Sequence, residues 1–323
     1  MGRKVLLLIA ACFAACGVSI ASASDYPTRP VRIITTAPAG GGTDLVLRVF
    51  ADKLSKEWNQ QVVVENRAGG GGIIASSYVL SSPADGYTLL GTFDAHATNP
   101  SFLSNLPYDT LKDFAPISLL STITMMVVMS PSLPVKSVQE LIALAKSKPG
   151  QIAYASIGKG SPQFIIGELL NDQAGIDLKH ISYKERSAIN ADVLAGRIPI
   201  MISSVAGVKQ FVEAGTMKAL AMTSSNRSPV LPNVPTFKEA GLPGVNFVSW
   251  VGLFAPANVP KDVIEKINAG VRKVATLPEV KEQIAKAGGD VSVNSPADFD
   301  AMIRKDMQNF SELAKKVNVK YPN

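Results

Sequence analysis

Continuous apolar runs alternate with segments of helical periodicity along the N-terminal third of the chain. Residues 31–34 form an apolar run typical of a buried strand, and apolar residues then recur at helical spacing over 45–54. The same order returns with a strand predicted over 61–65, a helix over 73–80 and a strand over 87–92. This alternation predicts an α/β fold with a parallel sheet, in which ligands bind at the carboxyl ends of the strands.

The pattern continues through the rest of the chain. Further strands are predicted over residues 123–129, 152–156, 180–183, 198–202 and 218–223, and further helices over 137–146, 162–170, 263–274 and 297–317. The Pro- and Ser-rich stretch 224–235 is typical of a surface crossing between units. Because the chain exceeds the usual size of one core, two domains are expected. We expect domain 1 over 24–124 and 226–323, and domain 2 over 125–225.

The first 23 residues have the features of a secretory signal peptide. Basic residues precede an apolar stretch over 5–15, and Ala21-Ser22-Ala23 is a small-residue cleavage site. We therefore expect export to the periplasm and a mature chain that begins at Ser24. A membrane anchor and a lipoprotein processed at Cys16 are the alternatives.

Composition narrows the chemistry of the mature chain. Both cysteines, Cys12 and Cys16, lie in the predicted signal peptide, so disulfides, thiolate metal sites and a cysteine nucleophile are excluded. The formal net charge of the whole chain is +6, and no run of Lys and Arg occurs. This mild positive excess favours small anionic ligands over nucleic acid.

Signatures of enzymes and of cofactor sites are sparse. The chain has two histidines, His96 and His180, and contains neither G-x-S-x-G nor a G-x-x-x-x-G-K-[ST] phosphate loop. Residues 70–75 match part of a dinucleotide fingerprint with Asp94 further on, but the loop after the preceding strand is too long for that motif. We expect no catalysis, no cofactor and no metal. The alternative is an exported enzyme acting on a carboxylate, with His96 or Asp94 as its acid or base.

The first predicted strand runs through a glycine-rich turn into a helix. Residues 38–41 have small side chains or none, and Thr43 or Asp44 is placed to cap the helix. Backbone N–H groups at the positive end of a helix suit a carboxylate or a phosphate. The turn is therefore a candidate anion site, with a tight turn that binds nothing as the alternative.

Two later segments place polar residues at the ends of strands in the same way. Ser156, Gly158, Gly160 and Ser161 form a second strand–glycine–helix turn, and residues 183–187 lie where the next strand meets a helix. Taken alone, residues 183–187 also fit an exposed charged loop. Three polar loops after three strands of two units predict a ligand cleft between domains.

A series of short motifs resembles a known family. The motifs are, in order, residues 26–33, 38–44, 64–67, 84–90, 108–116, 154–161, 183–184, 234–241 and 250–256. They extend over essentially the whole mature chain. In this order they resemble the Bug-type, TctC-like extracytoplasmic solute receptors of tripartite tricarboxylate transporters.

The resemblance implies a two-lobed periplasmic binding protein of the Venus-flytrap, type II-like form, with hinge crossovers. Such a receptor, expected as a monomer, closes on a small carboxylate (a di- or tricarboxylate or an aromatic acid) and presents it to membrane permease subunits. A ligand sensor for a membrane signalling protein is the alternative. In the family, the loops that match 38–44 and 156–161 face each other and hold the ligand carboxylates. The candidate ligand-binding residues are Thr36, Pro38, Ala39, Gly40, Gly41, Asp44, Thr92, His96, Ser156, Gly158, Gly160, Ser161, Tyr183, Lys184, Glu185, Arg186, Ser203 and Ser204.

Three departures from the family pattern bear on the ligand. Phe164 stands where a histidine is usual, Glu185 and Arg186 stand where glycines are common, and Ser203-Ser204 stand where many members have aspartate and asparagine. A serine cannot neutralise a ligand ammonium as a buried carboxylate would. We therefore expect a non-amino carboxylic acid, unless Glu185 supplies the missing charge.

Overall fold

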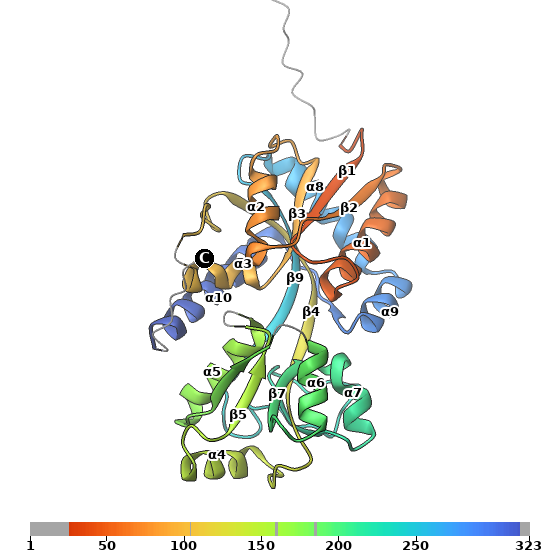
Figure 1. The fold of residues 1–323 in the computed structure, drawn as a ribbon. Helices are drawn as coiled ribbons and strands as arrows, with labels where there is room; N and C mark the ends of the chain where they lie inside the picture. Colours follow the sequence, from red (N-terminus) through yellow and green to blue (C-terminus); the bar gives the residue numbers. More distant parts are fainter. Residues whose placement is uncertain (1–25, 104, 159–160, 184–185, 317–323) are drawn as a thin grey trace, which may run out of the picture.

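The computed structural model describes residues 26–103, 105–158, 161–183 and 186–316, which form two lobes joined by long strands (Figure 1). Lobe 1 contains β1 (Val31–Thr35), α1 (Gly42–Trp58), β2 (Val62–Asn66), α2 (Ile73–Leu80), β3 (Thr88–Phe93), α3 (Ala95–Phe102), the first part of β4 (Phe114–Met129), β9 (Val248–Pro256), α8 (Lys261–Ala275), α9 (Pro278–Lys286), β10 (Asp290–Val291) and α10 (Pro296–Lys316). Lobe 2 contains the rest of β4, α4 (Val138–Ser147), β5 (Ala153–Ser156), α5 (Pro162–Ala174), β6 (Lys179–Ser182), α6 (Arg186–Leu194), β7 (Ile200–Ser204), α7 (Val205–Glu213) and β8 (Lys218–Met222). The α/β fold in two lobes is confirmed.

The strands follow the order β2-β1-β3-β9-β4-β7-β5-β6, and β8 and β10 also pair with β4. Inside the lobes the pairing is parallel, between β1 and both β2 and β3, and between β5 and both β6 and β7. The strands that join the lobes are different, because β9 is antiparallel to β3 and to β4, and β4 is antiparallel to β7. The prediction of a parallel sheet is therefore right within the lobes and wrong for β4 and β9.

The strand β4 passes from one lobe to the other. Residues 114–124 of this strand pair with β9 in lobe 1, and residues 125–129 pair with β7 and β8 in lobe 2. The sequence analysis predicted only the apolar second half of β4. Its first half is interrupted by Pro116 and by two irregularities in register, which hide the strand pattern.

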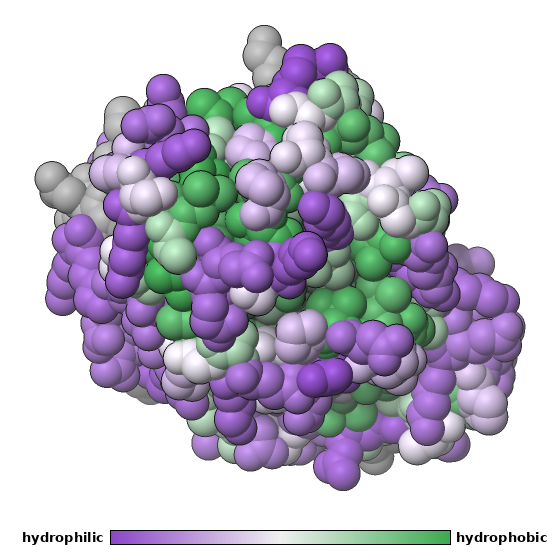
Figure 2. Space-filling view, turned by 90° about the horizontal axis from the view of Figure 1, so that it is seen from below, coloured by the Kyte–Doolittle hydropathy of each residue, from purple (hydrophilic) through white to green (hydrophobic). Residues whose placement is uncertain are grey.

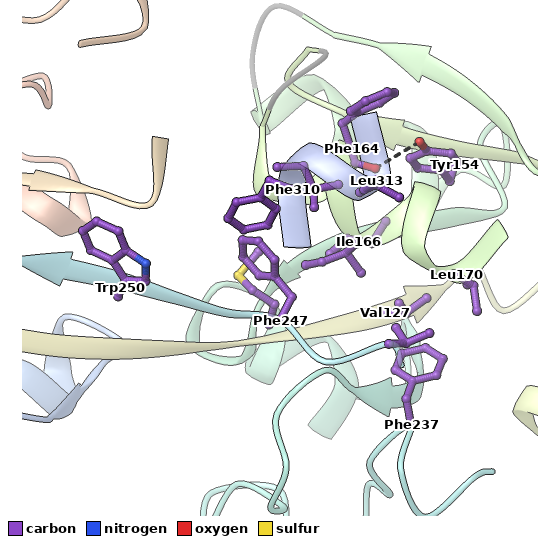
Figure 3. Close-up of a cluster of buried hydrophobic side chains, with 14 of the residues drawn as sticks. Val127, Tyr154, Phe164, Ile166, Leu170, Phe237, Phe247, Trp250, Phe310 and Leu313 are labelled. Atoms are coloured by element: carbon purple, nitrogen blue, oxygen red, sulfur yellow. Dashed lines mark hydrogen bonds between the residues drawn. The ribbon is translucent and has the colours of Figure 1, made fainter. Parts of the chain in front are cut away.

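The chain returns to lobe 1 later than the sequence analysis expected. The amide of Phe237 donates to the Met222 carbonyl oxygen, and Thr223 Oγ1 donates to the Phe247 carbonyl oxygen at 2.5 Å. Phe237 is fully buried and lies beside Val127 of the second half of β4 (Figure 3). Residues 226–247 therefore pack against lobe 2, and the chain re-enters lobe 1 at the start of β9.

The helix α10 crosses the junction between the lobes. In lobe 1 the Phe299 ring lies 5.5 Å from the Trp250 ring, and further along the helix the Phe310 ring lies 5.9 Å from the Phe247 ring. Figure 3 shows Phe310 and Leu313 of this helix next to Phe247 and the α5 side chains of lobe 2. The apolar face of α10 thus packs on both lobes. Most of its charged residues are exposed, as the sequence predicted, but Asp306 is an exception, because Trp250 Nε1 donates to its carboxylate.

The surface below lobe 2 is mostly hydrophilic, with smaller groups of apolar side chains between the polar ones (Figure 2). Across the four described ranges of the chain, every helix is too short or too polar to cross a lipid bilayer.

The helix α1 begins directly after the glycine turn. Its N-cap is Gly41, which has no capping side chain, so the prediction that Thr43 or Asp44 caps this helix is wrong. The turn is made by Gly40, whose φ of +76° is in the region that residues with a Cβ rarely adopt. Gly41 has φ −71°, so Gly40 is the residue whose conformation requires glycine.

Asp44 holds the glycine turn from inside the protein. Its buried carboxylate accepts hydrogen bonds from the Gly40 amide and Arg48 Nε, both at 2.9 Å, and from Asn66 Nδ2 at 2.7 Å. Burial opposes the ionised form, but the hydrogen bonds from Arg48, Asn66 and Gly40 outweigh it and lower the pKa of Asp44. The carboxylate therefore ties the turn to α1 and to the end of β2.

Replacing Asp44 with alanine should destabilise the protein by about 2 kcal/mol, because it leaves buried donors without an acceptor. The matched control is Asp52→Ala, which removes an exposed carboxylate paired with Lys56 and should cost less than about 1 kcal/mol. Since folding lowers the pKa of Asp44, its contribution is complete above the pKa of the unfolded state and is lost as the pH falls further. Urea unfolding should show the gap between wild type and Asp44→Ala narrowing below about pH 4. Equal stability of Asp44→Ala and Asp52→Ala at neutral pH would show that Asp44 does not hold the turn.

Candidate functional site

The first glycine loop, residues 36–41, lies between the carboxyl end of β1 and the N-terminus of α1. Thr36 and Thr92 are buried, and their Oγ1 atoms lie 3.1 Å apart, which ties the loop to β3. The amides of the first three residues of α1, 42–44, find no backbone or side-chain acceptor in the described part of the chain. Pro38, Ala39 and Gly40 are exposed beside them. The loop therefore offers unpaired backbone donors at the positive end of a 17-residue helix, which is an arrangement that favours a carboxylate.

The second glycine loop, residues 156–161, lies between β5 and the N-terminus of α5. The buried Ser156 Oγ accepts from the Gly158 amide at 3.0 Å, and Gly158 has φ +126°. Ser161 caps α5, because its Oγ accepts from the Phe164 amide at 3.3 Å and donates to the Gly158 carbonyl oxygen at 2.6 Å. Both serine side chains thus maintain the shape of the loop. Any ligand contact here falls to the backbone and to neighbouring side chains.

His180 supports the second loop from the adjacent strand. Its Nε2 lies 2.6 Å from Ser156 Oγ, and its ring lies 5.0 Å from the Phe164 ring and 5.2 Å from the Tyr154 ring. The sequence analysis counted His180 without giving it a role. The pairing of β5 with β6, in which Tyr154 is opposite His180, brings it to the loop, and no sequence motif signals that pairing.

The two lobes meet beside these loops. The Phe102 ring, at the end of α3 in lobe 1, lies edge-on to the Phe164 ring of α5 in lobe 2, with 6.5 Å between centroids. Both rings are buried. The phenylalanine at position 164 therefore gives this protein an apolar contact between the lobes close to the second glycine loop.

The third predicted segment is only partly described. Tyr183 donates from its hydroxyl to Asp192 Oδ2 at 2.5 Å, and burial, with this hydrogen bond, raises its pKa to about 12. Tyr183 therefore packs on α6 instead of offering its hydroxyl to a ligand. Lys159, Gly160, Lys184 and Glu185 lie outside the described residues, and of Arg186 only its place as the first residue of α6 is described.

Ser203 and Ser204, at the end of β7, have different surroundings. Ser203 is 1% exposed, and its Oγ has no hydrogen-bond partner among the residues that the structure describes. Ser204 caps α7, because its Oγ accepts from the Gly207 amide at 3.2 Å. Ser204 is therefore occupied as a helix cap, and Ser203 is the one with hydrogen-bonding capacity to spare.

His96 does not reach the loops. Its ring is buried against the rings of Tyr108, Phe114 and Phe254, at centroid distances of 5.7, 4.8 and 4.8 Å. Burial lowers the pKa of His96 to about 3, so the ring is neutral at physiological pH. Both ring nitrogens lack a hydrogen-bond partner in the described part of the chain. The roles expected for His96, as a ligand-binding residue or as an acid–base group, stay predictions.

The dinucleotide look-alike is a different structure. Gly70–Gly72 form a 3₁₀ turn in which each glycine has a positive φ, and Asn99 Nδ2 donates to the Gly71 carbonyl oxygen at 2.8 Å. Asp94 accepts a hydrogen bond from Ser249 and lies in the wall of a cavity beside α10. Neither half of the fingerprint has the geometry for a dinucleotide.

Gln163 is a candidate that the sequence analysis missed. It is the second residue of α5, it is buried, and no donor in the described part of the chain reaches its Oε1. The signal that could have found it is its place in the first turn after the Ser161-Pro162 helix start. The described residues contain no group of three or more His, Cys, Asp or Glu side chains that could hold a metal ion.

The fold and the sequence both match known receptors. The chain matches the family described as "Tripartite tricarboxylate transporter family receptor" (TctC) over residues 46–319. It is 31% identical to the protein BugT of Bordetella pertussis over 320 residues, which cover 98% of each chain. A solved structure of a Rhodopseudomonas palustris protein with adipate is 30% identical, with a TM-score of 0.79 over 92% of this chain and 100% of that one. MatC from Rhodopseudomonas palustris with bound malate is 26% identical, with a TM-score of 0.75 over 90% of this chain and 100% of that one.

These similarities extend over nearly the whole of each chain, and they concern both the amino-acid sequence and the overall fold. The resemblance to Bug-type receptors that the sequence motifs indicated is thereby confirmed. The chain belongs to the family of tripartite tricarboxylate transporter receptors.

Proposed function

We propose that this protein is a periplasmic solute receptor that binds a small dicarboxylate between its lobes. The observation that carries the proposal is the group of unpaired backbone amides at the N-terminus of α1. They lie beside a loop whose turn is fixed by the hydrogen bond from the Gly40 amide to Asp44. The similar proteins solved with adipate and with malate add support, because both ligands are dicarboxylates.

In this proposal each glycine loop binds one carboxylate of the ligand. Both loops follow the carboxyl ends of parallel strands and lead into helices, so each has a positive helix end. In the second loop the Gly158, Ser161 and Phe164 amides already have acceptors, and the Gln163 amide is the donor left among the described residues of the first turn of α5. Backbone donors recognise any carboxylate, so the choice among acids falls to the side chains around the loops. Gln163 and Ser203 each have a buried oxygen without a partner among the described residues, and they would bind the middle of the ligand.

Export by the predicted signal peptide, a monomeric state and delivery of the ligand to membrane permease subunits complete the proposal. The alternative of an exported enzyme has less support at His96, which aromatic rings enclose, and its other candidate acid or base, Asp94, lies in the wall of the cavity beside α10. A sensor that passes its ligand to a membrane signalling protein would use the same site, and the genes beside this one would separate the two. In either case the ligand is released unchanged.

Dicarboxylates should raise the melting temperature. A ligand at 100 times its Kd adds about 2.7 kcal/mol to the free energy of unfolding, which is on the order of 5 °C for a chain of this length. A thermal-shift screen with adipate, malate and succinate, beside their diamides and monocarboxylates, should give the largest shift for a diacid. Shifts by metal ions, nucleotides or neutral sugars alone would contradict the carboxylate site.

Gly40→Val should weaken dicarboxylate binding strongly while lowering the stability of the protein only a little. Valine at φ +76° is strained, so the turn should rearrange and displace the amides that follow it. The matched control is Gly175→Val, at φ +58° in the C-cap of α5 and with open space around its Cβ position. Calorimetry with the best diacid should show at least a tenfold weaker Kd for Gly40→Val and an unchanged Kd for Gly175→Val. Wild-type affinity in folded Gly40→Val would exclude the first loop from the site.

The ligand should lack an amino group near the Ser203 wall. In the matched pairs succinate–aspartate and glutarate–glutamate, the acid without an amino group should bind more tightly than the amino acid, because Ser203 cannot neutralise an ammonium. Ser203→Asp should narrow or reverse the preference, and Ser204→Asp, at the helix cap, serves as the control. Tighter binding of the amino acids by the wild-type protein would show that Glu185 or another acid supplies the charge.

A further inference from the structure

A cavity lies between the lobes on the α10 side of the junction. It has a volume of about 560 Å³, within the range of small-molecule sites. Its wall comes from α5 (Leu169, Gln173), from the segment that leads into β9 (Phe247), from β9 (Trp250) and from α10 (Asp306, Phe310). Its wall includes none of the described residues of the two glycine loops. We name it the hinge cavity, because α10 and the junction strand β9 form part of its wall (Figure 3).

The carboxylate of Asp94 lies in this wall, and one of its two oxygens is available as a hydrogen-bond acceptor. The residue is 1% exposed, and one of its carboxylate oxygens accepts a hydrogen bond from Ser249. The other oxygen, Oδ1, makes no hydrogen bond of normal geometry in the described part of the chain, although the backbone amides of Ala95 and Trp250 lie close enough to the carboxylate to lower its pKa. A buried carboxylate oxygen without a donor is costly unless a proton or a cation meets it.

A second carboxylate faces the same space from α10. Asp306 accepts from Trp250 Nε1 at 3.1 Å through its Oδ2. Burial raises the pKa of Asp94 to about 7, with a further rise from the nearby Asp306, and burial raises the pKa of Asp306 to about 6. Ser249 and the backbone amides of Ala95 and Trp250 offset the shift of Asp94 only in part.

The other charged groups of the wall do not neutralise this pair. Lys316 of α10 is held by Asp172 of α5 at 2.9 Å, so these two compensate each other. The remaining charged side chains of the wall are Glu312 and Lys305, both on α10, and the segment over 243–250 contributes none. Lys305 favours the ionised form of Asp306 and lowers its pKa in part, while the negative charge of Glu312 balances that of Lys305 in the wall. The wall therefore has an excess of negative charge when Asp94 and Asp306 are ionised, and apolar surface from Leu169, Phe247 and Phe310.

We propose that the hinge cavity is a second binding site, for a small organic ammonium ion with an apolar body. Asp94 is the counter-ion of the ammonium group, Asp306 is its second acceptor, and the aromatic and aliphatic side chains of the wall receive the apolar body. This ligand is opposite in charge to the one proposed for the glycine loops. Because the wall comes from both lobes, an occupant contacts both at once.

Trp250 makes the site directly observable. The chain has two tryptophans, Trp58 and Trp250, and Trp58 lies in a different surface hollow beside Tyr26. In a Trp58→Phe background the emission of Trp250 should change in a saturable way on titration with 2-phenylethylammonium at pH 8. The neutral isostere 2-phenylethanol should bind at least tenfold more weakly, because it leaves the carboxylates without a counter-ion.

Variants of the two carboxylates locate the site. Asp94→Asn and Asp306→Asn, each made in the Trp58→Phe background, should weaken 2-phenylethylammonium at least tenfold. The matched control is Asp172→Asn, an acid of the same wall whose charge already belongs to Lys316, and it should change the affinity less than threefold. Two independent variants keep the test decisive if Asp94→Asn fails to fold.

The pH profile separates a charge-paired site from an apolar one. The ammonium stays protonated throughout, so lowering the pH from 8 to 6 should weaken its binding about tenfold as Asp94 takes up a proton. Equal binding of amine and alcohol, a flat pH profile, or unchanged affinity in both Asn variants would overturn the proposal, as would displacement of the amine by Na⁺ or Mg²⁺ at millimolar concentration. Binding of dicarboxylates is measured separately on the same variants, so its loss or retention bears on the glycine loops alone.

Discussion

The antiparallel pairing of β4 with β9 is the constraint on which the rest of this structure depends. The two strands are hydrogen-bonded from the Phe114–Pro256 pair to the Thr124–Val248 pair, and β4 then continues into the sheet of lobe 2. Because β3 pairs with β9 and β7 pairs with β4, the sheets of both lobes are fixed to the same two strands. The carboxyl ends of the parallel strands, and the glycine loops that follow them, are held at the junction for that reason.

The recognition proposed for this junction would depend on backbone donors that buried side chains hold in place. Asp44 secures the first glycine loop through the Gly40 amide, and Ser156, Ser161 and His180 secure the second. Such an arrangement binds the carboxylate group common to many acids, since an amide does not distinguish one carboxylate from another. Differences among relatives then fall to the wall, where this chain has Phe164 and Ser203, and where the described residues leave the buried oxygens of Gln163 and Ser203 without partners.

The junction also explains why ionisable groups are buried on the α10 side. The helix α10 follows the junction from Phe299 in the core of lobe 1 to Phe310 beside Phe247. It contributes Asp306 to the wall of the hinge cavity, which Asp94 also lines. Burial raises the pKa of both carboxyl groups, whereas Asp44, which accepts three hydrogen bonds, has a lowered pKa. At Asp44 the hydrogen bonds from Arg48, Asn66 and Gly40, with the charge of Arg48, outweigh burial, whereas at Asp94 the hydrogen bonds offset burial only in part.

The sequence by itself determined the α/β class, the position of the strands and helices with long periodic patterns, and the two glycine turns. These features depend on local spacing, and the ordered motifs also identified the family. Only the tertiary structure decided which structural role each polar residue has. Asp44 holds a loop instead of capping a helix, Ser204 caps a helix, Tyr183 binds Asp192, and His96 is enclosed by three aromatic rings.

The return of the chain to lobe 1 at Val248, the antiparallel junction strands, and the meeting of Ser156 with His180 also became known only from the fold. Each of these depends on contacts between segments far apart along the chain, where local periodicity carries no information about the partner. The side chain of an isolated serine, aspartate or histidine fits a cap, a clamp or a ligand contact equally well. Only the neighbours that tertiary packing brings to it decide among them.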